Sequence, residues 1–181
     1  MRFLLTTFTS ALILFLWGGL TLAVIPWHSA VLHGVHDEAA VLKTLSEQAV
    51  DGGVYSVPIE HKNYTATSPF AMIVYRPRGF GMPAGGVMAI SFATSWLASI
   101  VAALLMPKKE GLSYARRVLF FLGLGVFASL TAHITNWTWS GYSAGYSLMA
   151  IFDLLAGWLL AGLFLARFLP RPVSATGEHA E

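Results

Sequence analysis

The chain has 181 residues, of which 56% are hydrophobic and 11% are charged, and its net charge is +2. This composition is typical of an integral membrane protein and not of a soluble domain. The small net charge does not indicate nucleic-acid binding, so we expect no nucleic-acid partner. The sequence contains no cysteine, which excludes disulfides, thiolate metal ligands and cysteine nucleophiles from these residues.

Four apolar stretches, at residues 3–25, 86–106, 118–136 and 147–166, are long enough to cross a bilayer. About 20 helical residues, at ~1.5 Å each, span a hydrocarbon core of about 30 Å. We therefore predict an all-α integral membrane protein with a four-transmembrane-helix bundle. The predicted helices are 1–25, 86–106, 118–136 and 147–167; the connecting segments are 26–85, 107–117 and 137–146, and the tail is 168–181.

Most basic residues fall on one side of the membrane if these four spans alternate in direction. That side carries Arg2, Lys108, Lys109, Arg116, Arg117, Arg167 and Arg171, and the other side carries Lys43, Lys62, Arg76 and Arg78. Loops rich in Lys and Arg stay cytoplasmic, so we expect both termini inside and residues 26–85 outside. We expect the inner (plasma) membrane of a bacterium. The first span lacks a convincing signal-peptidase site, so we interpret it as an uncleaved anchor.

The extracytoplasmic segment between the first two spans has the pattern of a small α-β-β insertion. Asp37 is a candidate helix N-cap, and apolar residues recur at helical spacing until Gly52 and Gly53. Two runs rich in β-branched and aromatic residues, 54–59 and 70–75, predict a hairpin. Pro58 limits the first run to an edge strand because proline has no backbone N–H.

Three of the predicted spans carry small or polar residues at helical spacing, which is typical of contact faces between membrane helices. The three rows are Ser91, Ser95, Ser99 and Ala103; Gly125, Ser129, His133 and Asn136; and Ala150, Asp153, Gly157 and Ala161. Both ionisable residues of the four apolar stretches, His133 and Asp153, lie on these rows. We therefore predict that the rows turn inward, because an ionised group in hydrocarbon is costly.

His133 and Asp153 are also predicted at similar depths. At ~1.5 Å per residue, they lie about 5 Å and about 9 Å inside the outer ends of their spans. We predict an outer-leaflet cluster of His133 and Asp153 with Asn136, Ser91 and Ser95. The predicted cluster has two interpretations. It could be a functional site, namely a proton-accepting pair, a ligand pocket or a cation site, or it could be a set of hydrogen bonds that fixes helix register. The apolar inner halves of the spans argue against a transport path.

A second group of candidate ligands follows the first span. His28, His33 and His36, with Asp37 and Glu38 next to them, are residue types that bind zinc or copper. Their spacings of five and three match no known ligand motif, and histidines also suit a membrane interface. Trp137 and Trp139 likewise have two interpretations, an interfacial aromatic belt or the lining of a quinone or headgroup pocket.

No motif for a nucleophile triad, a phosphate loop or a zinc protease is present. We therefore expect a non-catalytic accessory, assembly or structural subunit of a larger membrane complex. Its expected partners are the lipid bilayer and other membrane subunits or further copies of itself, and we expect no cofactor. The alternative is a ligand-, metal- or quinone-binding module or enzyme, with its site around His133 and Asp153.

Overall fold

The computed structural model of the chain describes residues 1–49, 51–60, 65, 67–107, 109 and 111–170. Within them, four helical segments are long and apolar enough to cross a membrane, which confirms the predicted number of candidate spans. They are α1 (Arg2–Ala23), α4 (Ala84–Leu105), the continuous run of α5 (Tyr114–Ser129), η1 (Leu130–Ile134) and α6 (Thr135–Ser140), and α7 (Ala144–Phe168).

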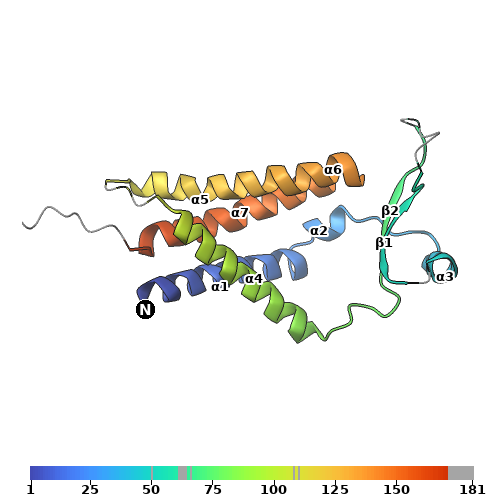
Figure 1. Cartoon of the computed structure of the whole chain (residues 1–181), viewed down its shortest axis with the longest axis horizontal. Coiled ribbons are helices and arrows are strands. Elements are labelled where there is room, and N and C mark those ends of the chain that lie inside the picture. The colour runs from blue at the N-terminus through green and yellow to red at the C-terminus, as the bar shows by residue number, and fades with distance from the viewer. Residues whose placement is uncertain (50, 61–64, 66, 108, 110, 171–181) are drawn as a thin grey trace, which may run out of the picture.

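The four helical segments alternate in direction (Figure 1). The N-terminus, the turn before α5 and the end of α7 lie at one end, and the insertion between α1 and α4 lies at the other. We call these the terminal end and the insertion end. Assignment of the terminal end to the cytoplasm stays a prediction. Of the basic residues on which it rests, Lys108 and Arg171 on the expected inner side and Lys62 on the outer side lie outside the described residues.

Helix α7 lies between α1 and α5 and contacts both. Glycines allow this close approach, because membrane helices associate by tight packing and not by exclusion of water. A Cβ atom added to Gly157 would lie 3.1 Å from Cδ1 of Trp17 on α1, and one added to Gly162 would lie 2.8 Å from Cβ of Phe121 on α5. The row of small residues predicted on the fourth span is therefore a packing face.

Helix α4 packs mainly on α1 and crosses it at an angle (Figure 1). Only at the terminal end does α4 join the core that it shares with α5 and α7. Ala102, Ala103 and Met106 pack there with Phe121 and Leu165. The core common to α4, α5 and α7 is thus concentrated near the terminal end, while much of α4 towards the insertion end is exposed.

A buried arginine ties α5 to α7 at the terminal end. Arg117 was expected in a loop, but it lies in the first turns of α5 and its side chain is buried. Its Nη2 donates a hydrogen bond of 3.0 Å to the carbonyl oxygen of Leu169, the C-cap of α7. A cation is favourable at this position because a helix C-terminus carries partial negative charge and unpaired carbonyls.

The seam between α1 and α4 is polar. The Oγ atoms of Ser10 and Ser99 lie 3.1 Å apart, and Nε1 of Trp96 donates to Oγ1 of Thr7 at 3.3 Å. In a bilayer, hydrogen bonds of this kind add only modestly to the stability of helix association, because separated helices also find polar partners. The sequence row on the second span is therefore divided: Ser99 is buried against this seam and Ala103 in the core shared with α5 and α7, whereas Ser91 is exposed.

We expect a double-mutant cycle with Ser10→Ala and Ser99→Ala to give a coupling free energy of about 0.6 kcal/mol, the typical value for hydrogen bonds between membrane helices. Thermal unfolding in lipid nanodiscs measures it. Thr94→Ala is the control, because that hydroxyl is exposed and bonds only to the carbonyl of Ile90 on its own helix. Additive single effects of Ser10→Ala and Ser99→Ala would show that the two hydroxyls do not interact.

The insertion contains the predicted helix and hairpin, preceded by one extra turn of helix. Its elements are α2 (Trp27–Ala30), α3 (Glu38–Gln48), β1 (Gly53–Val57) and β2 (Ala71–Tyr75). The carboxylate of Asp37 accepts a hydrogen bond from the backbone N–H of Ala40 at 2.9 Å, which confirms the predicted N-cap. The strands pair antiparallel, with Val54 opposite Val74, and β1 ends immediately before Pro58.

Candidate functional site

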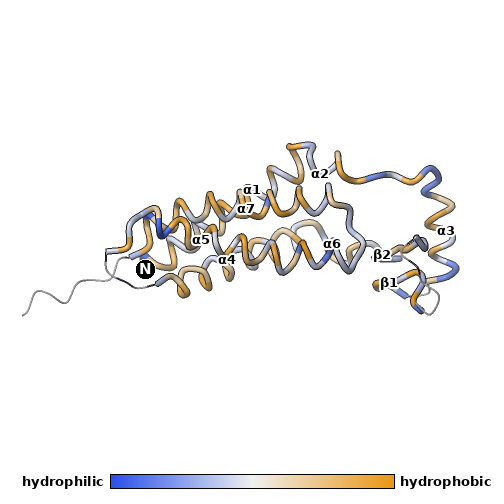
Figure 2. Tube along the Cα trace, turned by 90° about the horizontal axis from the view of Figure 1, so that it is seen from above, coloured by the Kyte–Doolittle hydropathy of each residue, from blue (hydrophilic) through white to orange (hydrophobic). Residues whose placement is uncertain are grey.

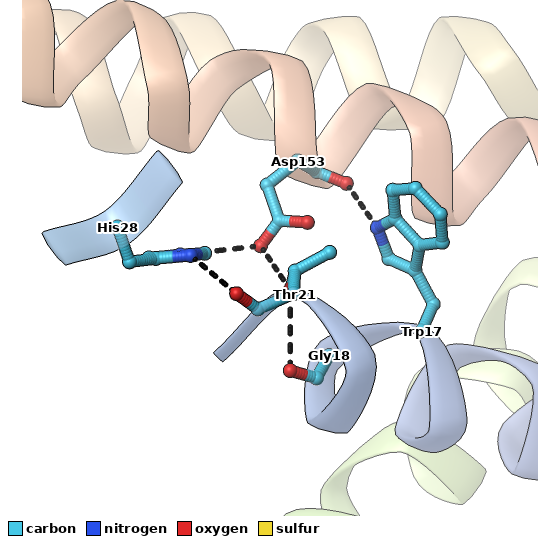
Figure 3. Close-up of polar contacts among 5 residues, drawn as sticks. All are labelled: Trp17, Gly18, Thr21, His28 and Asp153. Atoms are coloured by element: carbon cyan, nitrogen blue, oxygen red, sulfur yellow. Dashed lines mark hydrogen bonds and ion pairs between the residues drawn. The ribbon is translucent and has the colours of Figure 1, made fainter. Parts of the chain in front are cut away.

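The carboxylate of Asp153 lies where α7 faces the end of α1, near the insertion end (Figure 3). Its Oδ2 is 3.3 Å from Oγ1 of Thr21 and 3.6 Å from Nε2 of His28. The side chains of His28 and Asp153 are 19% and 21% exposed. We call His28, Thr21 and Asp153 the polar triad.

The polar triad exists because the chain makes a tight turn after α1. Helix α1 ends at Ala23, Pro26 caps α2, and the single turn of α2 brings His28 back over the end of α1. There Nδ1 of His28 lies 2.9 Å from the carbonyl oxygen of Thr21. Four residues before Thr21, on the same face of α1, Trp17 donates from Nε1 to the carbonyl oxygen of Asp153 at 3.0 Å.

The two ring nitrogens of His28 face different partners. A carbonyl oxygen only accepts, so Nδ1 of His28 donates the hydrogen bond to Thr21. Nε2 lies 3.6 Å from Oδ2 of Asp153, which is within ion-pair range and longer than a hydrogen bond. His28 therefore contacts the end of α1 through one ring nitrogen and α7 through the other.

Aromatic rings enclose the polar triad on one side. The ring of Trp27 stands edge-on to those of Trp17 and Phe152, at centroid distances of 6.0 and 5.4 Å. Nε1 of Trp27 and Oδ1 of Asp153 are buried and have no hydrogen-bond partner among the residues that the structure describes. The site therefore offers one further donor and one further acceptor beside the contact of His28 with Asp153.

The structure pairs Asp153 with residues other than those expected. In the described part of the chain, no hydrogen bond or ion pair joins Asp153 to His133, Asn136, Ser91 or Ser95. His133 is half-buried in η1, a π-helical segment, and Asn136 follows in α6. The half-buried Ser95 donates to the carbonyl oxygen of Ser91 on its own helix.

Two features explain this difference. The expected face of the third span assumed a uniform α-helix, but each π-type i→i+5 turn holds more residues and rotates whatever follows. Helix α4, in addition, packs on α1 and crosses it, so Ser91 lies on an exposed part of the helix. The sequence signal for the actual partners was the i, i+4 pair Trp17 and Thr21, with His28 shortly after a proline.

The three histidines proposed as metal ligands lie in different surroundings. His28 belongs to the polar triad, whereas His33 and His36 are exposed. Among the described residues, no group of three or more His, Asp or Glu side chains is arranged to hold a metal ion. The structure thus assigns His28 to a contact between α2 and α7.

Comparisons with known proteins do not extend this description. No protein-family model, curated protein or solved structure matches the chain. Function must therefore be argued from the residues and their geometry alone.

Proposed function

We propose that this chain is a non-catalytic subunit of a larger membrane complex, and that the exposed face of α3 binds another subunit. The observation that carries the proposal is the lack of a core in the insertion. Across its described residues, 31–49, 51–60, 65 and 67–83, Ala49 is the only buried side chain. A folded unit of this size normally buries more than half of its surface, and units that bury less need additional support.

Helix α3 is the part of the insertion best placed for a protein partner. Figures 1 and 2 show it beyond the hairpin, farther from the membrane helices. Val41 and Leu42 on α3 are 42% and 58% exposed, although both are apolar. Exposed neighbouring apolar side chains on a water-facing helix are typical of a helix that packs on another protein.

The proposal is tested by purification in mild detergent from cells that make the protein naturally. We expect a membrane protein to co-purify in fixed stoichiometry with the unchanged chain and to be lost from the Val41→Ser, Leu42→Ser double variant. Glu47→Ala is the matched control, because Glu47 is exposed on the same helix and alanine preserves helicity. A partner retained by the double variant, or a chain that purifies alone or only with its own copies, would contradict the proposal.

A second candidate function is a small binding module at the polar triad. It is supported by the buried Oδ1 of Asp153 and Nε1 of Trp27, which have no hydrogen-bond partner among the described residues. A small polar ligand or a quinone carbonyl would satisfy such groups. Native mass spectrometry of the purified protein tests this function. A bound small molecule that is lost in Asp153→Asn but kept in His133→Gln would support it, whereas equal loss from both variants would not.

A further inference from the structure

The hairpin of β1 and β2 runs across the axis of the membrane helices. Figure 1 shows the two strands at the insertion end, transverse to α1, α5 and α7, and Figure 2 shows them at the same end from above. If those helices cross a membrane, the hairpin lies roughly parallel to its surface. One face of the hairpin must then look towards the lipid, and the other towards α3.

A contact at the start of β2 identifies the face that looks towards the membrane helices. A Cβ atom added to Gly141, just after α6, would lie 3.1 Å from the ring of Phe70. Side chains alternate along a strand, so Met72 and Val74 share the side of Phe70. Val54 pairs with Val74 across the sheet and therefore lies on the same face. We call Val54, Met72 and Val74 the inner hairpin face.

The inner hairpin face is mostly apolar and open, and its one polar neighbour, the half-buried Ser56, pairs with Met72. Val54 and Val74 are 68% and 64% exposed, whereas Tyr55, Ile73 and Tyr75, which alternate with them, are half-buried. Two exposed valines opposite each other on a two-stranded sheet are not covered by any described residue of this chain. Phe80, shortly before α4, and Trp139, in α6, are also exposed. Aromatic side chains near the ends of membrane helices favour the lipid headgroup region.

Positive charge lies next to this apolar face. Arg76 and Arg78, in the segment that connects β2 to α4, line one surface hollow together with Asp51, which lies before β1. The guanidinium of Arg76 lies 5.1 Å from the centre of the Phe80 ring. Arginine binds phosphate oxygens in a forked geometry, and basic residues next to apolar ones are typical of segments at a phospholipid surface.

We propose that the hairpin binds the phospholipid surface at the insertion end. The inner hairpin face contacts the headgroup and upper acyl region, and Arg76 and Arg78 bind lipid phosphates. This surface is distinct from the α3 face assigned to a protein partner, so either assignment can fail alone. In this arrangement, lipid covers the apolar side chains of the inner hairpin face, which no described residue of the insertion covers.

The absence of cysteine makes a site-specific test direct. Val74→Cys and, as the matched valine control on α3, Val41→Cys are each labelled with an environment-sensitive fluorophore in the full-length protein. The labelled proteins are placed in nanodiscs that contain headgroup-spin-labelled phospholipid. We expect the spin label to quench the fluorophore at position 74 several-fold more than at position 41, and aqueous iodide to quench in the opposite order. Val54→Cys repeats the measurement on the paired strand.

Equal quenching by iodide at positions 74 and 41 would overturn the proposal. So would protection of position 74 from both quenchers, because that result would mean that protein and not lipid covers the inner hairpin face. Arg76→Gln with Arg78→Gln tests the phosphate contact separately. We expect this double variant to lose part of the lipid quenching at position 74, and unchanged quenching would overturn the role of the two arginines.

Discussion

Gly162→Ala is expected to destabilise the protein by about 1–3 kcal/mol, the usual cost of adding a methyl group to a tightly packed core. The new Cβ would lie 2.8 Å from Cβ of Phe121, closer than two carbon atoms can approach. Phe121 is fully buried in the core at the terminal end and cannot move away without displacing α5. Thermal unfolding in nanodiscs should show a lower midpoint.

Gly123→Ala is the matched control on α5. Nothing lies within 4 Å of a Cβ atom added to Gly123. Alanine there should stabilise the helix by about 0.5–1 kcal/mol, because glycine loses more backbone entropy on folding. The two glycine substitutions therefore have opposite expected signs. If Gly162→Ala were as stable as the unchanged protein, α5 and α7 would not pack as closely as the structure shows.

His28→Ala is expected to lower the free energy of unfolding by about 1–3 kcal/mol, the cost of leaving a buried polar group without its partner. The variant removes the imidazole that lies 3.6 Å from Oδ2 of Asp153, so the carboxyl group keeps Thr21 as its one polar side-chain contact among the described residues. It also removes the hydrogen bond from Nδ1 to the carbonyl oxygen of Thr21. Loss of both contacts should release α2 from the ends of α1 and α7.

A double-mutant cycle separates this contact from a general loss of packing. We expect His28→Ala and Asp153→Asn to be coupled by about 1 kcal/mol, within the range for residues in contact. The corresponding cycle of His133→Gln with Asp153→Asn should show no coupling, because no described contact joins those two residues. Coupling of Asp153 to His133 and not to His28 would contradict the structure and restore the pairing expected from the sequence.

Local features of the fold could be predicted because they depend on nearby residues. The four apolar stretches predicted the candidate spans by length and hydropathy. Asp37 predicted the start of α3 because a carboxylate can accept a hydrogen bond from a backbone N–H three residues later. The two β-branched runs predicted the paired strands, since alternation and proline placement are visible in sequence.

The candidate site could be predicted only in part. Because an ionised group in hydrocarbon is costly, the sequence predicted that Asp153 lies on an inward face with polar partners. The structure gives it Thr21 and His28. His133 was the predicted partner because uniform helical periodicity put both residues on facing rows. A π-helical segment at Leu130–Ile134 breaks that periodicity, and hydropathy and helical spacing did not predict it.

The sequence by itself therefore determined which segments are apolar helices, where α3 and the hairpin lie, and that Asp153 requires a partner. Only the tertiary structure decided which partner it has. That choice depends on the turn at Pro26, on the orientation of α7 that brings Gly157 against Trp17, and on the packing of α4 against α1. Each of these is a relation between segments far apart in sequence, and hydropathy and periodicity report only on one segment at a time.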